Sequence, residues 1–366
     1  MPPDQHNHEA FMKRALLLAR RGEGRTSPNP MVGAVIVRDN RIIAEGYHLY
    51  ERKDHAEIVA LSRAGGQARG ADLYVNLEPC SHYGRTPPCV DEVIRAGIRR
   101  VFIAHLDPNP RVSGQGVSRL REAGIDVEVG FLEEPALRLN EAFLHFVTHH
   151  VPFVTLKLAQ TLDGKIASGS GESKWITGEV ARERTHRMRF LNDAILVGVG
   201  TVLRDNPSLD VRWRRSNPIT KVVLDSHVRT PPDARLFDSG DKVMIFHSEE
   251  RSPQDYPENA KLIKVPAKDR GVSWDEVCKH LGQLQVTSLL VEGGSRVAAS
   301  ALQAGVVRKV ALFYALKIFG SGGLSAIADL GLQSLDESIQ LRAPSLRRVG
   351  DDFLLEAYID SFRESS

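Results

Sequence analysis

The sequence predicts an α/β fold in two domains, and three observations support that prediction. The chain has 366 residues, which is more than one hydrophobic core usually serves, since domains run to roughly 100–200 residues. Hydrophobic residues make up 42% of it and charged residues 26%, close to the average of soluble globular chains, which excludes a disordered, collagenous or coiled-coil protein. Strand-like and helix-like segments alternate along the chain, as is typical of crossover units on a mostly parallel sheet.

The first domain, residues 1–150, is expected to open with a helix. Apolar residues at helical spacing predict it over 9–21, and Gly22 ends it. Two short β-rich runs then flank Asp39-Asn40, a pair that tolerates the backbone of a tight turn, so we expect a hairpin. The expected elements that follow the first helix are strands near 32–37 and 41–44, a helix near 56–64, a strand at 71–77, a helix at 90–96, a strand at 100–104, a helix at 113–123 and a strand at 126–129.

The second domain, residues 151–366, repeats this alternation. A helical stretch near 135–149 ends before Pro152 and a new strand opens at Phe153, which places the boundary close to residue 150. Strands are expected near 153–158, 194–198, 221–225, 242–246, 288–291 and 309–314, and helices near 178–190, 273–284 and 295–304.

The charge balance and the cysteines favour a cytoplasmic protein that acts on small molecules. The 48 Lys and Arg residues nearly cancel the 46 Asp and Glu residues, so nothing global suggests a nucleic-acid or membrane partner. The three cysteines, Cys80, Cys89 and Cys278, are too few for a disulfide framework and suit a reducing compartment. We expect no leader segment and no membrane span, because no run approaches the roughly 18 apolar residues that a span needs. A homo-oligomer is the expected assembly.

One histidine, one glutamate and two cysteines have the pattern of a catalytic zinc site. His55 and Glu57 begin a helix, and Cys80 and Cys89 follow a strand about two dozen residues later. One imidazole and two thiolates can therefore converge above the end of that strand. Three ligands leave the fourth zinc position open for a water that the metal acidifies. Glu57 is then placed to move protons rather than to bind metal.

Each of these residues also has a purely structural explanation. Asp54 could cap the helix while Glu57 reaches back in a capping box, and the two cysteines could be small buried thiols. The combination, with a proline before Cys80 and a strand–loop–helix context, favours the zinc hydrolase.

Four segments around these residues resemble the deaminase half of the bifunctional bacterial riboflavin-biosynthesis deaminase/reductase family. They are 27–33, 46–48, 55–57 and 78–89, and the eight residues between the cysteines, rather than two, are that family's spacing. The resemblance implies a cytidine-deaminase-like three-layer α/β/α domain in which His55, Cys80 and Cys89 bind Zn²⁺ and Glu57 is the catalytic proton shuttle. It also implies substrate contacts from Asn29, His48, His82 and Arg85, although the last two could equally belong to a solvated loop.

A strand, a glycine pair and a helix start at 290–300 form a turn that can approach a phosphate. Alone this signal is weak, because a Gly-Gly turn is more often simply tight, and it is not the Gly-x-Gly-x-x-Gly of a Rossmann fingerprint. Segments 156–165, 171–177 and 200–212, however, resemble the reductase half of the same family. That resemblance implies a dihydrofolate-reductase-like α/β domain that uses NADPH.

The resemblance assigns two sets of residues in this second domain. The NADPH site is expected to be lined by Ala159, Trp175, Thr201, Asp205, Ser226, Gly294, Ser295, Arg296, Val297, Ala298, Ala299 and Ser300. Substrate is expected to be held by Lys157, Ser173, Arg189, Leu209, Arg212 and Glu292. Arg189 and Arg212 offer forked, charge-assisted donors for a phosphate. A solvated helix face would also explain Arg189, and a turn before Asn206 would explain Asp205.

The resemblance covers about residues 9–359 and implies a bifunctional enzyme of small phosphorylated pyrimidines. It implies zinc-dependent deamination of 2,5-diamino-6-ribosylamino-4(3H)-pyrimidinone 5′-phosphate. NADPH-dependent reduction of the ribosyl group of 5-amino-6-(5-phosphoribosylamino)uracil to ribityl would follow.

Two alternatives from other functional classes remain. One is an RNA- or nucleoside-directed zinc deaminase whose second half binds nucleic acid through basic residues at 182–189 and 212–215. The near-zero net charge argues against it. The other is a binding protein with a structural zinc, which three ligands and an adjacent glutamate describe less well than an open catalytic site.

Overall fold

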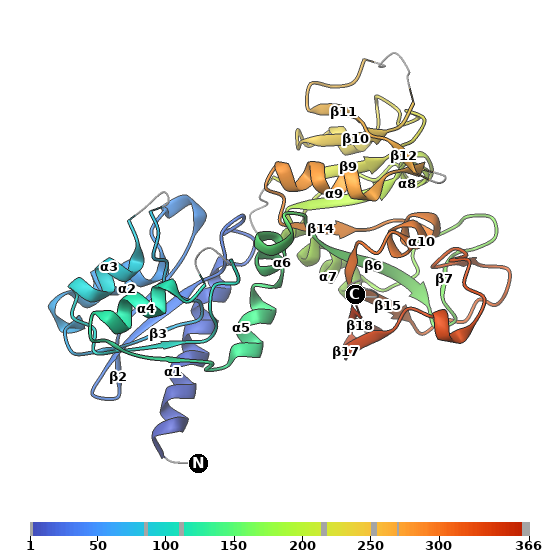
Figure 1. Cartoon of the computed structure of the whole chain (residues 1–366). Helices are drawn as coiled ribbons and strands as arrows, with labels where there is room; N and C mark the ends of the chain where they lie inside the picture. The colour runs from blue at the N-terminus through green and yellow to red at the C-terminus, as the bar shows by residue number, and fades with distance from the viewer. Residues whose placement is uncertain are drawn as a thin grey trace. The chain divides into compact units, whose positions relative to one another are not determined.

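The computed structural model describes residues 3–83, 87–109, 113–213, 218–249, 255–268 and 271–360. The chain divides into two compact units, Met1–His150 and Val151–Ser366 (Figure 1).

The first unit is built on a five-stranded sheet with the order β2-β1-β3-β4-β5. The strands are β1 (Gly33–Arg38), β2 (Arg41–Tyr47), β3 (Asp72–Val75), β4 (Arg100–Ile103) and β5 (Asp126–Val129). β1 is antiparallel to β2 and β3, whereas β3, β4 and β5 are parallel. Asp39 and Asn40 join β1 to β2 with φ angles of 48° and 58°, the left-handed backbone that a two-residue hairpin turn needs.

Helices cover both faces of this sheet. They are α1 (Pro3–Ala19), α2 (Ala56–Ala64), α3 (Cys89–Arg95), α4 (Gln115–Glu122), α5 (Glu133–Leu139) and α6 (Glu141–His149). Alternate strand residues face opposite sides: Ile36 packs with α2, α3 and α4, whereas Val35 and Val37 pack with α1. The three-layer α/β/α arrangement expected from the sequence is therefore confirmed. The single helical stretch expected near 135–149 is instead two helices that meet at Asn140.

The second unit is built on a nine-stranded sheet with the order β11-β10-β9-β8-β14-β6-β15-β18-β17. The strands are β6 (Phe153–Thr161), β8 (Ala194–Gly198), β9 (Thr220–Leu224), β10 (Val243–His247), β11 (Ala260–Lys264), β14 (Ser288–Val291), β15 (Val307–Ala315), β17 (Leu341–Val349) and β18 (Asp352–Ile359). The seven from β11 to β15 are parallel to their neighbours, and β18 and β17 close the sheet antiparallel. Two short pairs, β7 (Lys165–Ala167) with β16 (Leu324–Ser325) and β12 (Ala267–Lys268) with β13 (Gly271–Val272), lie outside it.

Helices also cover both faces of the large sheet. They are α7 (Glu179–Phe190), α8 (Val199–Asp205), α9 (Trp274–Gln283) and α10 (Ser295–Gln303). α9 and α10 pack on the face that carries Leu289 and Val291, whereas α7 packs on the face that carries Leu290. The predicted α/β class is confirmed for this unit, but the sequence reading missed α8 and the strands β7, β11, β12, β13, β16, β17 and β18. Among the described residues, no helix combines the length and apolarity that crossing a bilayer requires.

Candidate metal and cofactor sites

The three side chains expected to bind zinc converge in the first unit. His55 is the residue just before α2, Cys89 is the first residue of α3, and Cys80 lies in the loop between β3 and α3. The Nδ1 atom of His55 lies 3.0 Å from the Sγ of Cys89 and 3.5 Å from the Sγ of Cys80. All three potential ligand atoms lie within 4.8 Å of one another. One nitrogen and two sulfurs are a donor set that suits Zn²⁺.

The electrostatics of this cluster favour a thiolate at Cys80, whereas the hydrogen bond with Cys80 and burial raise the pKa of Cys89. Hydrogen bonds with Cys89 and with His55 lower the pKa of Cys80 to about 4, against the opposing effect of burial. The hydrogen bond with Cys80 raises the pKa of His55 to about 9. Since the thiolate is the form of cysteine that binds metal, the low pKa of Cys80 favours its role as a ligand.

Glu57 lies beside the cluster and does not cap the helix. It is 3% exposed, and its Oε2 atom is buried without a hydrogen-bond partner among the described residues. Burial raises the pKa of this carboxyl group. The start of α2 has no side-chain capping hydrogen bond, so the capping-box explanation of Glu57 is wrong. A buried carboxylate oxygen without a partner is costly, and its place beside three metal-type donors fits a proton-transfer group that acts on a bound ligand.

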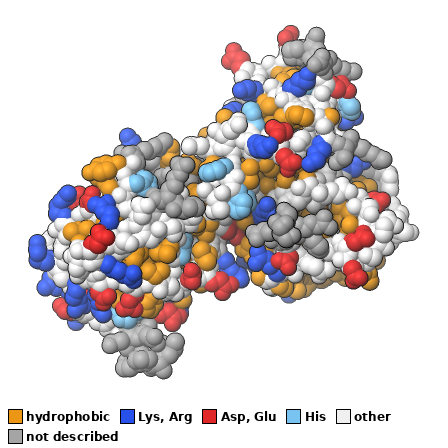
Figure 2. All heavy atoms as spheres, viewed as in Figure 1, with side chains coloured by type: hydrophobic (Ala, Val, Ile, Leu, Met, Phe, Trp, Pro, Cys, Tyr) orange, Lys and Arg blue, Asp and Glu red, His pale blue; other side chains and the backbone are white. Residues whose placement is uncertain are grey.

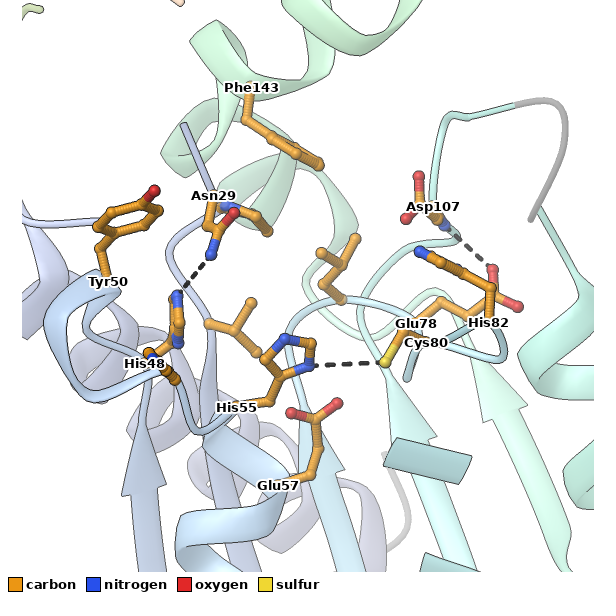
Figure 3. Close-up of a pocket in the computed structure, with 14 residues that line it drawn as sticks. Asn29, His48, Tyr50, His55, Glu57, Glu78, Cys80, His82, Asp107 and Phe143 are labelled. Carbon is orange, nitrogen blue, oxygen red and sulfur yellow. Dashed lines mark hydrogen bonds between the residues drawn. The ribbon is translucent and has the colours of Figure 1, made fainter. Parts of the chain in front are cut away.

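These residues open onto a cavity of about 280 Å³ (Figure 3). Five of the expected residues line it together with Glu57, and they are Asn29, His48, His55, Cys80 and His82. Arg85 lies outside the described residues. Sequence reasoning missed several polar or aromatic residues of the lining, among them Tyr50, Lys53, Glu78, Asp107 and Phe143.

Asn29 and His48 form a fixed pair on one wall of the cavity. His48 Nδ1 lies 2.8 Å from the Asp54 carbonyl oxygen and Nε2 lies 3.0 Å from Asn29 Nδ2. Nδ1 must carry the proton to donate to a carbonyl, so Nε2 accepts from the Asn29 amide. Burial lowers the pKa of His48, which favours this neutral form. Asn29 thus keeps its Oδ1 as an acceptor for a ligand.

In the second unit, most residues expected at the NADPH site lie at one edge of the sheet. Ser226 follows β9, Thr201 lies in the helix that follows β8, Gly294 follows β14, and Ala159 lies near the end of β6. β9, β8, β14 and β6 are neighbouring parallel strands, so their carboxyl ends meet at this edge, which is where α/β sheets bind ligands. Asp205 ends α8, and residues 295–300 form the first turns of α10.

The glycine pair before α10 permits a close approach of the backbone. A Cβ on Gly293 would lie 2.5 Å from Cβ of Val297, whereas a Cβ on Gly294 would meet only Thr201 Oγ1, at 4.0 Å. Gly293 is therefore required by packing, and Gly294 leaves space at the start of the helix. Trp175 lies on the loop between β7 and α7 and is 65% exposed, with the Arg182 guanidinium 4.4 Å from its ring centre.

A buried ion-pair cluster joins three residues of the expected substrate site. Arg189 donates from Nε and Nη2 to the two carboxylate oxygens of Glu292, at 2.7 and 3.1 Å, and Lys157 Nζ lies 3.7 Å from Glu292 Oε2. Burial raises the pKa of Glu292, but the charges of Arg189 and Lys157 outweigh burial and lower it to about 2. The Arg189 side chain is only 15% exposed, so the solvated-face explanation is wrong.

The same arginine binds the loop that carries Leu209 and Arg212. Arg189 Nη1 donates to the Asp210 carbonyl oxygen at 2.9 Å, and the Arg212 amide donates to His186 Nδ1 at 3.3 Å. Leu209 is buried, whereas the Arg212 side chain is exposed and available to a ligand. Ser173 lies on the loop between β7 and α7, and one residue separates it from Trp175 in the sequence.

Comparisons with known proteins match both units. Residues 152–355 match the family described as the RibD C-terminal domain, and residues 5–105 match the cytidine and deoxycytidylate deaminase zinc-binding region. The chain is 43% identical to the riboflavin biosynthesis protein RibD of Aquifex aeolicus, over 94% of this chain and 96% of that protein. It is 39% identical to the RibD of Escherichia coli strain K12, over 95% and 98%.

A solved structure agrees with these relatives. It is the Thermotoga maritima diaminohydroxyphosphoribosylaminopyrimidine deaminase/5-amino-6-(5-phosphoribosylamino)uracil reductase, with 41% identity, a TM-score of 0.87 and coverage of 97% of this chain and 99% of that one. The resemblance that the motifs indicate is therefore confirmed over nearly the whole chain.

Proposed function

Because the chain belongs to the RibD family of riboflavin biosynthesis proteins, we propose that its two units catalyse consecutive steps of that biosynthesis. The protein is a bifunctional enzyme, a zinc-dependent deaminase and an NADPH-dependent reductase. Its substrates are the diaminopyrimidine ribosyl phosphate and then the aminouracil that deamination produces.

In the deaminase unit, His55, Cys80 and Cys89 would hold a zinc ion. Zinc with three protein ligands and an open position supplies a hydroxide nucleophile near neutral pH, because it lowers the pKa of water. Glu57 would take a proton from the attacking water and pass it to the ring nitrogen as the oxygen bonds to C2. It would then take the proton of the new C2 hydroxyl and pass it to the 2-amino group, so that the C2–N bond breaks, ammonia leaves and a C2 carbonyl remains. The fixed Asn29–His48 pair orients the ring through the Asn29 Oδ1.

When bound in the reductase unit, NADPH would supply a hydride to C1′ of the ribosyl group, and a proton would go to the imine nitrogen of its ring-opened form. The residues at the carboxyl ends of the neighbouring strands β6, β8, β9 and β14 would hold the cofactor. Lys157, fixed beside Glu292, contacts the sugar. Arg212 binds the 5′-phosphate. Arg189 uses three of its N–H groups on Glu292 and on the Asp210 carbonyl, so it contributes to phosphate binding with its remaining donors and by holding this loop.

One observation carries the deaminase proposal: a buried carboxylate oxygen of Glu57 without a partner lies beside a His, Cys, Cys donor cluster. The test is turnover of the free diaminopyrimidine nucleotide, followed as ammonia release. An RNA-directed deaminase would instead require RNA and show a steep salt dependence of binding. On the face seen in Figure 2, Lys and Arg side chains are interspersed with Asp and Glu, whereas an RNA-binding module gathers basic side chains.

The phosphate contact gives a quantitative prediction for the reductase. Replacing Arg212 with alanine removes a charge-assisted hydrogen bond of roughly 1.5–3 kcal/mol, so the reductase KM for the aminouracil nucleotide should rise about ten- to a hundredfold. Deamination by the same variant should be unchanged, because the proposed deaminase residues belong to the other unit. Steady-state NADPH oxidation and ammonia release measure the two activities. An unchanged reductase KM would remove Arg212 from the phosphate site.

We further propose a cytoplasmic homo-oligomer without a nucleic-acid partner. Three free cysteines suit a reducing compartment. Within the described part of the chain, the edge strand β17 pairs only with β18 and is exposed along nearly its whole length, with Leu346 65% exposed. Long exposed edges of this kind favour association.

Light scattering of the purified protein should therefore give a mass that is a multiple of the chain mass. Leu346→Arg should shift it toward the monomer. A monomeric wild-type protein at micromolar concentration would contradict the proposal.

A further inference from the structure

Asn140, between α5 and α6, hydrogen-bonds through its side-chain amide to a backbone segment near the deaminase cavity. Asn140 precedes α6, a position where asparagine usually caps the helix with its own side chain, but no such capping bond is formed. Instead its Oδ1 accepts from the Met31 backbone amide at 2.8 Å and its Nδ2 donates to the Met31 carbonyl at 3.0 Å. The residue is 3% exposed. Both polar groups of this buried side chain thus bond the backbone amide and carbonyl of one residue far away in sequence.

The backbone around Met31 is also hydrogen-bonded to Asn76, at the end of a sheet strand. Asn76, which directly follows β3, donates from Nδ2 to the same Met31 carbonyl at 3.0 Å and accepts from the Gly33 amide at 2.8 Å. Met31 lies two residues after Asn29, whose amide pairs with His48 on the cavity wall. The segment that presents Asn29 is therefore fixed on one side by β3 and on the other by α6.

Phe143 lies three residues after Asn140, on α6, and lines the deaminase cavity. In Figure 3 its ring projects from α6 toward the cavity, on the side away from Glu57 and His55. His55 and Glu57 thus lie on one side of the cavity, and an aromatic ring lies on another. Stacking on an aromatic side chain stabilises a bound planar heteroaromatic ring, and alanine substitution of such a side chain weakens binding about five- to a hundredfold.

We propose that α6 forms the substrate-binding wall of the deaminase site, with Phe143 as the contact to the planar pyrimidine ring and Asn140 as the positioning residue for Asn29. This inference rests on the proposed deaminase function and deepens it. It assigns to the end of the first unit a part in ring recognition that the zinc-binding motifs do not contain.

The first test compares aromatic and aliphatic side chains at position 143. Phe143→Ala should raise the deaminase KM for the diaminopyrimidine nucleotide about five- to a hundredfold, and Phe143→Leu, which keeps an apolar contact, about two- to tenfold. Phe143→Tyr keeps the ring and should restore a KM close to that of the wild type. Phe146→Leu is the matched control on the same helix, outside the cavity lining, and should leave KM unchanged. Zinc content and reductase activity of every variant report whether the protein is folded.

The second test is a double-mutant cycle between positions 140 and 29. If Asn140 acts through Asn29, Asn140→Ala should raise the deaminase KM in the wild-type background but have little further effect in an Asn29→Ala background. Additive effects of the two changes would contradict the positioning role.

The outcomes separate this inference from the function on which it rests. A wild-type KM in Phe143→Leu and Phe143→Ala would overturn the ring contact while leaving the deaminase function intact. A wild-type protein that releases no ammonia from the nucleotide would overturn both.

Discussion

Replacing Glu57 with glutamine should lower the deamination rate by about 10²–10⁴-fold while zinc stays bound, because the change removes a proton-transferring carboxylate and keeps the side-chain volume. Glu57 is buried beside the cluster but is not one of the three residues whose ligand atoms converge. The kcat for ammonia release and the zinc content by elemental analysis measure the two properties separately.

The reductase activity of the same variant is the internal control, since the proposed reductase residues belong to the other unit. A helix-capping role would cost about 0.5–2 kcal/mol of stability and leave the rate nearly intact. A Glu57→Gln protein that deaminates at the wild-type rate would therefore exclude Glu57 as the proton shuttle.

Replacing Cys80 or Cys89 with serine should remove zinc and abolish deamination. A serine hydroxyl is a poor substitute for the thiolate that the cluster favours at Cys80. Zinc content after dialysis against a chelator, together with ammonia release, is the measurement.

Cys278→Ser is the matched control. Cys278 packs in the hydrophobic core of the second unit, and burial raises its pKa to about 12, so it remains a neutral thiol. Its replacement should leave zinc content and deamination unchanged, at some cost in stability for the buried hydroxyl. Full zinc occupancy in the Cys80 variant would contradict the ligand assignment.

Local chemistry made part of the fold predictable from sequence. Asp39-Asn40 identified the hairpin because few residues other than glycine and these two tolerate its backbone, and the helix expected near 56–64 has the observed bounds of α2. The edge strand β17 was missed because nearly all of its residues are exposed, so it has no alternating pattern. The seven-residue helix α8 is too short for periodicity to distinguish it from a loop.

In the candidate sites, too, residues with a local sequence pattern could be predicted and long-range contacts could not. The proposed zinc ligands belong to short motifs, and their residue types, with the proline before Cys80 and the strand–loop–helix context, brought His55, Cys80 and Cys89 into one hypothesis. The bond between Asn140 and Met31 joins residues 109 positions apart, and no local pattern announces it. No local pattern predicts the pairing of Arg189 with Glu292, 103 positions away. This pairing uses donors of Arg189 that its chemistry alone would assign to a phosphate.

The central claim is that one chain deaminates first and reduces second, and product identification by mass tests it most directly. The purified protein is incubated with the diaminopyrimidine nucleotide, with and without NADPH. We predict that only the deaminated ribosylamino species forms without NADPH, and that the deaminated ribitylamino species forms with it. A reduced product that still carries the 2-amino group, accumulating before any deaminated one, would contradict the proposed order of the two reactions.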